Sequence, residues 1–363
     1  MNICISNYLD HLNGSDPYSL RREEKRAIYL EVLTELTKHH YQSCPEYKNL
    51  MDKLGCEKIK FETIEHLPFL PVSLFKEFKM MSVKNDEIVQ VLTSSGTSGS
   101  NLSRIYLDRL NATGQKRALT KIVADTTGQT RLPMLIIDTK ESVKQRRSFS
   151  GRGAGIAGFS FLGKDITYVL DEDMNLDHQA LDAFCQRNSG KKILLFGFTY
   201  MVWQYFCNAL MKTSHSYQLT GSVLIHGGGW KKLHENSVSN DVFRNMVKEV
   251  LGVEKVVNYY GMVEQTGSIF LECDAGYYHC SNYSDVITRD ENFSACQYGE
   301  SGIMQLISPL ATSYPGHNIL SEDAGVIMGE DDCVCGKNGK YFSINGRLKH
   351  SELRGCSDTY PGR

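Results

Sequence analysis

Lys191-Lys-Ile-Leu-Leu-Phe-Gly197 and Ser222-Val-Leu-Ile-His-Gly-Gly-Gly229 share one pattern, a short apolar run that ends in glycine. Leu132 to Asp138 and Lys255 to Tyr260 are two more runs of this kind. Apolar runs of this length between turn residues are typical of buried β-strands. Strands that alternate with helical stretches predict a largely parallel or mixed sheet covered by helices, an α/β fold. Ligand sites in such folds lie at the carboxyl ends of the strands, where these glycines stand.

The segments around these strands predict three parts of the chain. We expect an N-terminal helical segment over 1–90, in which 21–40 forms one amphipathic helix and 67–76 runs extended into a short helix. A strand at 89–92 should cross into an α/β core over 91–345. This core should contain a helix at 111–124 and, after residue 300, a smaller β element with strands at 302–308 and 324–328. The last part, 346–363, is a short tail.

Composition and charge narrow the class of protein. The 363 residues suggest two sizeable domains, because domains average about 150 residues. The 40 Lys and Arg nearly balance the 42 Asp and Glu, which argues against a protein that binds nucleic acid through bulk positive charge. The 11 cysteines are an odd number and too sparse for a disulfide scaffold, so we expect a reducing compartment.

The N-terminal stretch and the apolar runs predict a cytoplasmic location. Residues 1–10 have neither a basic region nor a long apolar region, so we expect no signal peptide. The most apolar stretch, 193–206, is interrupted by Gly197, Thr199 and Gln204 and is shorter than the roughly 20 residues of a membrane span.

Two glycine motifs fail when their context is considered. Gly153-Ala-Gly155-Ile-Ala-Gly158 has the spacing of a dinucleotide-binding loop, but the charged stretch before it is not strand-like, so we predict a flexible glycine loop. These glycines either open a long pocket or bend the loop. Gly158-Phe-Ser-Phe-Leu-Gly-Lys164 resembles a phosphate-binding loop, but Asp165 stands where Ser or Thr must reach Mg²⁺.

Four weaker motifs survive, and the first three have an ordinary structural alternative. Thr93-Ser-Ser-Gly-Thr-Ser-Gly-Ser100 combines hydroxyls with glycines that allow close backbone approach to phosphate, although a linker has the same composition. Glu264, in Tyr260-Gly-Met-Val-Glu264, could bind Mg²⁺ or be a solvated side chain. Asp323 is predicted in a turn before a strand, where it could accept hydrogen bonds from ribose hydroxyls or serve only to form the turn. The fourth motif is Gly346-Arg-Leu-Lys349.

The order of these motifs is similar to that of the adenylate-forming (acyl-AMP ligase) superfamily. Within it the chain most resembles the acyl-protein synthetases of bacterial luminescence, the LuxE-like family, and it is also similar to phenylacetate-CoA ligase-like enzymes. The matching segments are Leu67-Pro-Phe-Leu-Pro71, Leu92-Thr-Ser-Ser-Gly-Thr-Ser-Gly99, His226-Gly-Gly-Gly-Trp-Lys-Lys232, Tyr259-Tyr-Gly-Met-Val-Glu-Gln265 and Arg354-Gly-Cys-Ser-Asp358.

The resemblance implies the large-domain fold of an adenylate-forming ligase, with sheets covered by helices and a smaller β element. It also implies that a carboxylic acid, of the fatty-acid type, attacks the α-phosphate of ATP to give acyl-AMP and pyrophosphate. His226 to Gly229 would line the adenine or acyl side of the site. The implied cofactor-binding residues are Ser94, Ser95, Gly96, Thr97, Ser98 and Gly99 for the phosphates, Tyr260 near adenine, Glu264 for Mg²⁺, Asp323 and Arg347 for ribose, and in addition Gly228 and Gly261.

Two departures from the superfamily pattern bear on the reaction. Arg104 is at best a substitute for the lysine that usually follows the phosphate loop, and the chain ends soon after Gly346-Arg347, so we expect most of the C-terminal domain to be absent. In the resembling family the acyl group moves to a cysteine near the C-terminus and then to a reductase partner. Cys356 matches that cysteine by position and would be the acyl acceptor. Together with Glu264 and Arg347 from the motifs above, it completes the set of implied catalytic residues. An ordinary terminal thiol is the alternative for Cys356.

Four further residues predict a structural zinc site. Cys273, His279, Cys333 and Cys335 would supply three thiolates and one imidazole, a set typical of a closed tetrahedral site. Similar positions in phenylacetate-ligase-like relatives support this expectation. Separate buried thiols are the alternative, and Cys280 could replace His279 as the ligand.

The sequence thus predicts an ATP- and Mg²⁺-dependent ligase that passes an acyl group to a protein thiol, of its own chain or of a partner. CoA as the acceptor, or a non-catalytic relative that binds an acyl group or a partner protein, are the alternatives. We expect no nucleic-acid partner and no membrane span.

Overall fold

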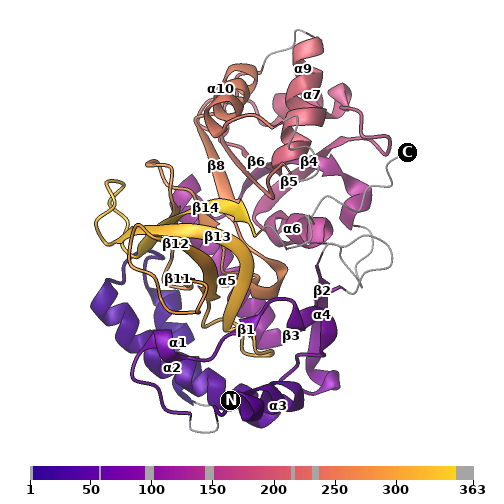
Figure 1. Ribbon diagram of the computed structural model, residues 1–363. Coiled ribbons are helices and arrows are strands. Elements are labelled where there is room, and N and C mark those ends of the chain that lie inside the picture. Colours follow the sequence, from indigo (N-terminus) through magenta and orange to yellow (C-terminus); the bar gives the residue numbers. More distant parts are fainter. Residues whose placement is uncertain are drawn as a thin grey trace. The chain divides into compact units, whose positions relative to one another are not determined.

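The computed structural model describes residues 3–56, 59–94, 102–143, 151–213, 217–230 and 237–348 (Figure 1). These residues divide into two compact units. The first takes the described residues within 3–94, 102–122 and 261–348, and the second takes those within 123–260. The helix α5, Arg109–Thr127, continues from the first unit into the second.

The first unit is built on an antiparallel sheet whose strands run in the order β10-β14-β13-β12-β11, with the short β1 added in parallel to β13. The strands of this sheet are β1 Leu70–Pro71, β10 Tyr278–His279, β11 Asp285–Arg289, β12 Ser301–Ile307, β13 Asn318–Glu330 and β14 Lys340–Arg347. The short strand β9, Phe270–Leu271, also lies in the first unit but is not part of this sheet. A separate hairpin pairs β2, Ile88–Thr93, with β3, Arg104–Asp108. The helices are α1 Ile3–Gly14, α2 Arg22–Ser43, α3 Pro45–Lys53, α4 Leu74–Glu77 and the short turns η1 Ile64–His66, η2 Asn85–Glu87 and η6 Val263–Gln265.

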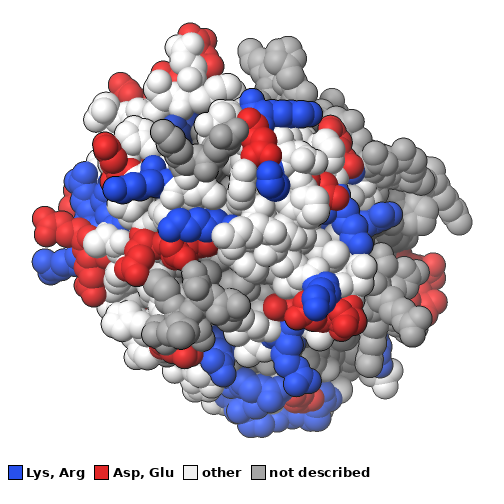
Figure 2. All heavy atoms as spheres, turned by 90° about the horizontal axis from the view of Figure 1, so that it is seen from below, with Lys and Arg blue, Asp and Glu red and all other residues white. Residues whose placement is uncertain are grey.

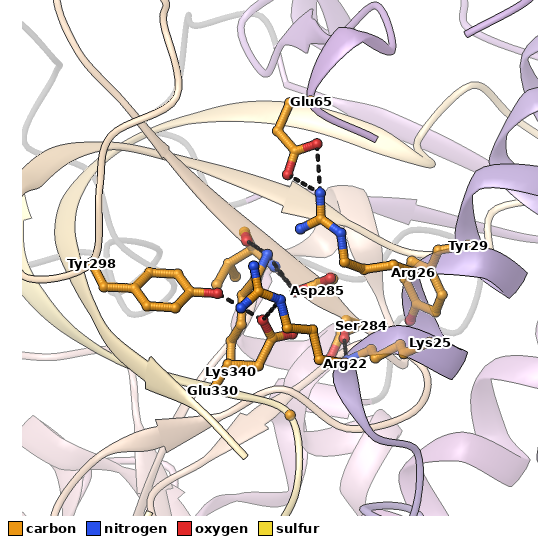
Figure 3. Close-up of polar contacts among 12 residues, drawn as sticks. Arg22, Lys25, Arg26, Tyr29, Glu65, Ser284, Asp285, Tyr298, Glu330 and Lys340 are labelled. Carbon is orange, nitrogen blue, oxygen red and sulfur yellow. Dashed lines mark hydrogen bonds and ion pairs between the residues drawn. The ribbon is translucent and has the colours of Figure 1, made fainter. Parts of the chain in front are cut away.

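Buried charges join α2 to this sheet (Figure 3). Lys340 Nζ lies 3.2 Å from Oδ1 of Asp285, and both side chains are almost fully buried. Lys25, on α2, donates from Nζ to the carbonyl oxygens of Ser281 and Ser284 at 2.9 and 2.8 Å. Burial alone would raise the pKa of Asp285, but Lys340 and Lys25 hold that pKa below its usual value. The network therefore fixes α2 on the sheet through paired rather than isolated charges.

The second unit is a parallel sheet in the order β5-β4-β6-β7-β8. The strands are β4 Leu132–Thr139, β5 Gly163–Leu170, β6 Leu194–Phe198, β7 Val223–Gly227 and β8 Lys255–Tyr260. The helices are η3 Lys140–Val143, α6 Gly151–Ser160, α7 His178–Arg187, α8 Thr199–Met201, the π-helix η4 Val202–Cys207, α9 Asn208–Lys212 and α10 Asn240–Leu251.

Helices cover both faces of this parallel sheet. On one face, Leu135 of β4 and Leu195 of β6 share a core with Phe184 of α7, Phe206 of η4 and Val247 of α10. Alternate strand residues point to the other face, as the two-residue period of a strand requires. There the ring of Phe196 stacks on Phe159 of α6, with centroids 4.2 Å apart.

The structure corrects the expectation of a flexible glycine loop at 153–158, because α6 is a helix through all three glycines. A Cβ on Gly155 would lie 3.0 Å from Cζ of Phe198, so the glycine lets this helix pack closely against the end of β6. Arg152 anchors the same helix by pairing with the buried Asp138 at the end of β4. Because a strand, β5, follows α6, the rejection of a phosphate-binding loop at 158–164 is supported.

Surface charge agrees with the near-neutral composition. In Figure 2 blue and red side chains are interspersed over the face that is drawn. Among the described residues, no helix combines the length and the apolar character needed to cross a membrane.

Candidate functional site

The hairpin β2–β3 carries the base of the Ser/Thr/Gly loop. The backbone N–H of Ser94 donates to the carbonyl of Ser103 at 3.1 Å, and the N–H of Ser103 donates to Oγ of Ser94 at 3.0 Å. These two bonds close the loop at its base, next to the β2–β3 ladder. The predicted phosphate-binding residues Ser95, Gly96, Thr97, Ser98 and Gly99 lie outside the described residues.

Glu264 lies in the short turn η6, in the same unit as the hairpin, and is 6% exposed. Burial raises the pKa of Glu264, while Ser103 and Lys76 act in the opposite direction. The solvated alternative for this carboxylate is therefore wrong, because a solvated side chain is not buried. A buried carboxylate stays ionised only when a cation or hydrogen-bond donors lie next to it. A buried glutamate is therefore a suitable ligand for a metal ion.

Asp323 and Arg347 face each other as register partners on β13 and β14. The Arg347 Nε lies 3.7 Å from Oδ1 of Asp323, and the two side chains are 39% and 18% exposed, so both remain within reach of a ligand. The expectation of a turn at Asp323 is wrong, because β13 already begins at Asn318. The ladder holds Asp323 inside the strand, at a register irregularity between Ala324 and Gly325.

The His226-Gly-Gly-Gly segment ends β7 in the second unit. His226 is buried; its Nδ1 lies 2.9 Å from Oγ1 of Thr199, and its ring packs on Phe243 with centroids 4.4 Å apart. Burial lowers the pKa of His226 to about 3, so this imidazole is neutral at physiological pH. Gly228 follows with a φ of +80°, in the left-handed region. Tyr260 is the last residue of β8, and Gly261 follows it.

The four predicted zinc ligands come together in the first unit. Ligand atoms of Cys273, His279, Cys333 and Cys335 all lie within 4.8 Å of one another. Cys273 Sγ is 4.0 Å from Sγ of Cys333, and Cys335 Sγ is 3.3 Å from Nε2 of His279. Tetrahedral zinc with Zn–S bonds of about 2.3 Å separates its sulfur ligands by about 3.8 Å, so the set fits zinc. The alternative of scattered thiols is wrong.

Two similar turns present these cysteines. The N–H of Gly276 donates to the Cys273 carbonyl, and the N–H of Gly336 donates to the Cys333 carbonyl, each at 2.9 Å. His279 lies on β10, which pairs with β14, so the cluster joins two turns to the edge of the sheet. Cys280 is not in this cluster, which favours His279 over Cys280 as the fourth ligand.

Sequence reasoning missed the residues that hold Glu264 in place. The hydroxyl of Tyr314 donates to the Glu264 carbonyl at 2.8 Å, and Nε2 of Gln265 donates to the carbonyls of Leu306 and Gly316. Tyr314 follows β12 in the chain and has no motif of its own. The one indication of a structured turn is the position of Tyr314 in Ser313-Tyr-Pro-Gly-His317, where Pro and Gly are typical turn residues. Cys356 lies outside the described residues.

The sequence profile of the family described as acyl-protein synthetase, LuxE, matches residues 1–361. The chain belongs to this family. The long-chain-fatty-acid–luciferin-component ligase of Vibrio harveyi is 23% identical over 375 residues, which cover 98% of this chain and 93% of that protein. The protein of the same name from Aliivibrio fischeri is also 23% identical, with the same coverage. Phenylacetate-coenzyme A ligase of Thermus thermophilus is 32% identical over 87 residues, covering 22% of this chain and 20% of that ligase.

Among solved structures, 2-hydroxyisobutyryl-CoA ligase in complex with 2-HIB-AMP is similar, with a TM-score of 0.69 and 15% identity, over 91% of this chain and 69% of that one. The family resemblance and the adenylate-forming fold expected from the sequence are therefore confirmed. As a member of its family, the chain is an ATP-dependent acid–thiol ligase that activates a carboxylic acid and transfers the acyl group to a protein. ATP and Mg²⁺ are what adenylate-forming ligases use.

Proposed function

We propose that this chain condenses a long-chain fatty acid with ATP and passes the acyl group to its own Cys356. One observation carries the proposal of the activation site. The base of the Ser/Thr/Gly loop, the buried carboxylate of Glu264 and the facing pair Asp323–Arg347 all belong to one unit of the fold. The names of the Vibrio and Aliivibrio relatives support a long-chain fatty acid as the substrate.

Each group has a role that its chemistry supports. The loop 94–99 would bind the phosphates through N–H groups and hydroxyls, and Asp323 and Arg347 would bind the ribose hydroxyls. Tyr260 would lie near adenine, Gly228 would line the adenine or acyl side, and Gly261 would also contribute to nucleotide binding. Glu264 would hold Mg²⁺, which neutralises phosphate charge when it is bound.

Two displacements make up the proposed reaction. A carboxylate oxygen of the acid attacks the α-phosphorus of ATP, the bond to the bridging oxygen breaks, and pyrophosphate leaves. The thiolate of Cys356 then attacks the carbonyl carbon of the acyl adenylate, and AMP leaves with the electron pair of the broken C–O bond. The thioester would next be consumed by an acyl-accepting or reductase partner.

We also propose that Cys273, His279, Cys333 and Cys335 bind a structural zinc ion. The set of four protein ligands is closed, so it leaves no position for substrate. The ion would fasten the β13–β14 connection to the turn at Cys273 and to β10, and so stabilise the sheet that carries Asp323 and Arg347.

The test of the activation step is exchange of radiolabelled pyrophosphate into ATP with a series of straight-chain acids. We expect exchange that depends on the acid and rises with chain length. Exchange that is fastest with aryl acids, together with AMP release that requires CoA, would favour the phenylacetate-CoA ligase alternative. No exchange with any acid would favour the non-catalytic relative.

A further inference from the structure

The connection between β12 and β13, residues 308–317, is unusual for a loop because each of its residues is buried. Its polar groups are bonded to three other elements. Oγ of Ser313 lies within hydrogen-bond distance of two acceptors, Oδ1 of Asn111 on α5 at 2.7 Å and the carbonyl oxygen of Tyr106 on β3 at 2.8 Å. His40 of α2 bonds through Nε2 to the Ala311 carbonyl at 3.0 Å. A loop held in this way is a rigid support rather than a mobile link.

This connection holds the turn that carries Glu264. The Tyr314 hydroxyl donates to the main-chain carbonyl of Glu264 at 2.8 Å, and Nε2 of Gln265 donates to the Gly316 carbonyl at 2.8 Å. Two adjacent residues of η6 are thus each tied to the same loop. The bonds to this loop are made by the Glu264 carbonyl and the Gln265 side chain, and neither of them uses the Glu264 carboxylate.

Packing leaves the Tyr314 ring little freedom. Tyr314 is completely buried, and its ring meets Phe75 edge to face with centroids 6.2 Å apart. A Cβ on Gly316 would lie 2.1 Å from Cε2 of Tyr314 and 2.9 Å from the Glu264 carbonyl oxygen. Loop, ring and turn are therefore packed in direct contact, and only glycine fits at 316.

We propose that Tyr314 is a positioning residue for the proposed activation step, which holds the carboxylate of Glu264 where Mg²⁺·ATP meets it. The inference rests on the proposed function of Glu264 as the metal ligand. A ligand carboxylate that moves by a fraction of an ångström binds its cation less well, because metal coordination distances are narrow.

Tyr314→Phe tests this proposal, because it removes the hydroxyl and keeps the ring. Tyr283→Phe is the matched control: Tyr283 is also buried in the first unit, and its hydroxyl donates to a main-chain carbonyl, that of Leu12, at 3.0 Å. Acid-dependent pyrophosphate exchange is measured against Mg²⁺ concentration, and thermal unfolding is followed for each variant. We expect Tyr314→Phe to raise the half-saturating Mg²⁺ concentration about three- to tenfold, the effect of one lost hydrogen bond. Tyr283→Phe should leave the half-saturating Mg²⁺ concentration unchanged, although it should lower the melting temperature by a similar amount.

A second variant keeps the test decisive if Tyr314→Phe does not fold. Gln265→Met has a similar shape but no donor for the Gly316 carbonyl, and it should shift the Mg²⁺ dependence in the same direction. Equal Mg²⁺ dependence in wild type, Tyr314→Phe and Gln265→Met would overturn the inference while leaving the activation step intact. A wild type without acid-dependent exchange would instead overturn the proposed function on which the inference rests.

Discussion

Asp323 and Arg347 stand opposite each other on β13 and β14, with 3.7 Å between Oδ1 of Asp323 and Nε of Arg347. The pair joins two residues from motifs that are separate in the sequence. Neither side chain is fully buried, so a ligand with hydroxyl groups can reach an acceptor and a donor at one place on the sheet. This geometry supports the proposed ribose site.

Replacing Asp323 by Asn should weaken nucleotide binding and leave the fold stable. We expect the KM for ATP in pyrophosphate exchange to rise about tenfold, because a charged acceptor for hydroxyl groups is lost. The melting temperature should change little, since a partly exposed ion pair contributes about 0–1 kcal/mol. Asp165→Asn is the control, because Asp165 forms an exposed pair with Arg187 at 3.3 Å. An equal KM in both variants would contradict the ribose role.

Glu264→Gln should separate activity from stability. Burial raises the pKa of the Glu264 carboxyl, so ionising it disfavours the folded state, and a neutral amide of the same shape removes that cost. We expect an unchanged or higher melting temperature together with exchange slower by about a hundredfold or more. Calorimetry measures the melting temperature, and the pyrophosphate exchange assay on the same preparation measures the activity. A variant that keeps its activity would show that Glu264 does not hold the metal.

Zinc should be found in the freshly purified protein at one ion per chain. Removing it with a chelator, or replacing Cys333 by Ser, should lower the melting temperature by about 5 °C or more, because a closed site contributes directly to folding. Cys296→Ser is the control, since Cys296 belongs to the same unit and lies outside the cluster. Elemental analysis that finds no zinc in the wild type would remove the site.

Stability should fall with acid because of two stacked histidines in the first unit. The rings of His40 and His317 are fully buried with centroids 5.0 Å apart. Burial lowers the pKa of His317 to about 3 and lowers that of His40 well below its usual value. The unfolded chain therefore binds these protons first, and the free energy of unfolding decreases as the pH falls from about 6.5 toward 3. His317 contributes a slope of about 1.4 kcal/mol per pH unit in that window, and His40 adds to the slope below its usual pKa.

Denaturant unfolding at a series of pH values measures this dependence. His317→Gln should unfold with a shallower pH dependence than the wild type, by about one proton. His66→Gln, which changes an exposed histidine, should keep the wild-type slope. Identical slopes in all three proteins would show that His317 does not titrate as its burial requires.

The sequence predicted the elements whose residues have one dominant pattern. The strands at 194–198, 223–227 and 255–260 are apolar runs with glycine at or just after the end, and they lie in the sheet as expected. The strand β5 was not predicted, because it lies at the sheet edge and begins with the exposed, charged Lys164 and Asp165, which interrupt the apolar pattern of a buried strand. The helix α6 was missed because glycine disfavours helices in isolation, and only its close packing on Phe198 explains those residues.

The candidate site was predictable where several metal-binding side chains occur in the sequence, although their spacing is not a common zinc-finger pattern. Three cysteines and a histidine signalled the metal cluster before their geometry was known. The support of Glu264 by Tyr314 could not be foreseen, because a hydrogen bond across 50 residues leaves no local pattern. Asp323 was assigned to a turn because Ser321-Glu-Asp323 is polar, while the structure places it in the middle of a long strand.

The most direct test of the account is to incubate the protein with radiolabelled long-chain fatty acid and ATP and to measure label that stays bound after denaturation. We predict ATP-dependent label on the wild type that neutral hydroxylamine releases as a thioester does, and no bound label on Cys356→Ser, which should still exchange pyrophosphate. Cys207→Ser should be labelled like the wild type. A wild type that takes up no label and exchanges no pyrophosphate with any acid would contradict the account.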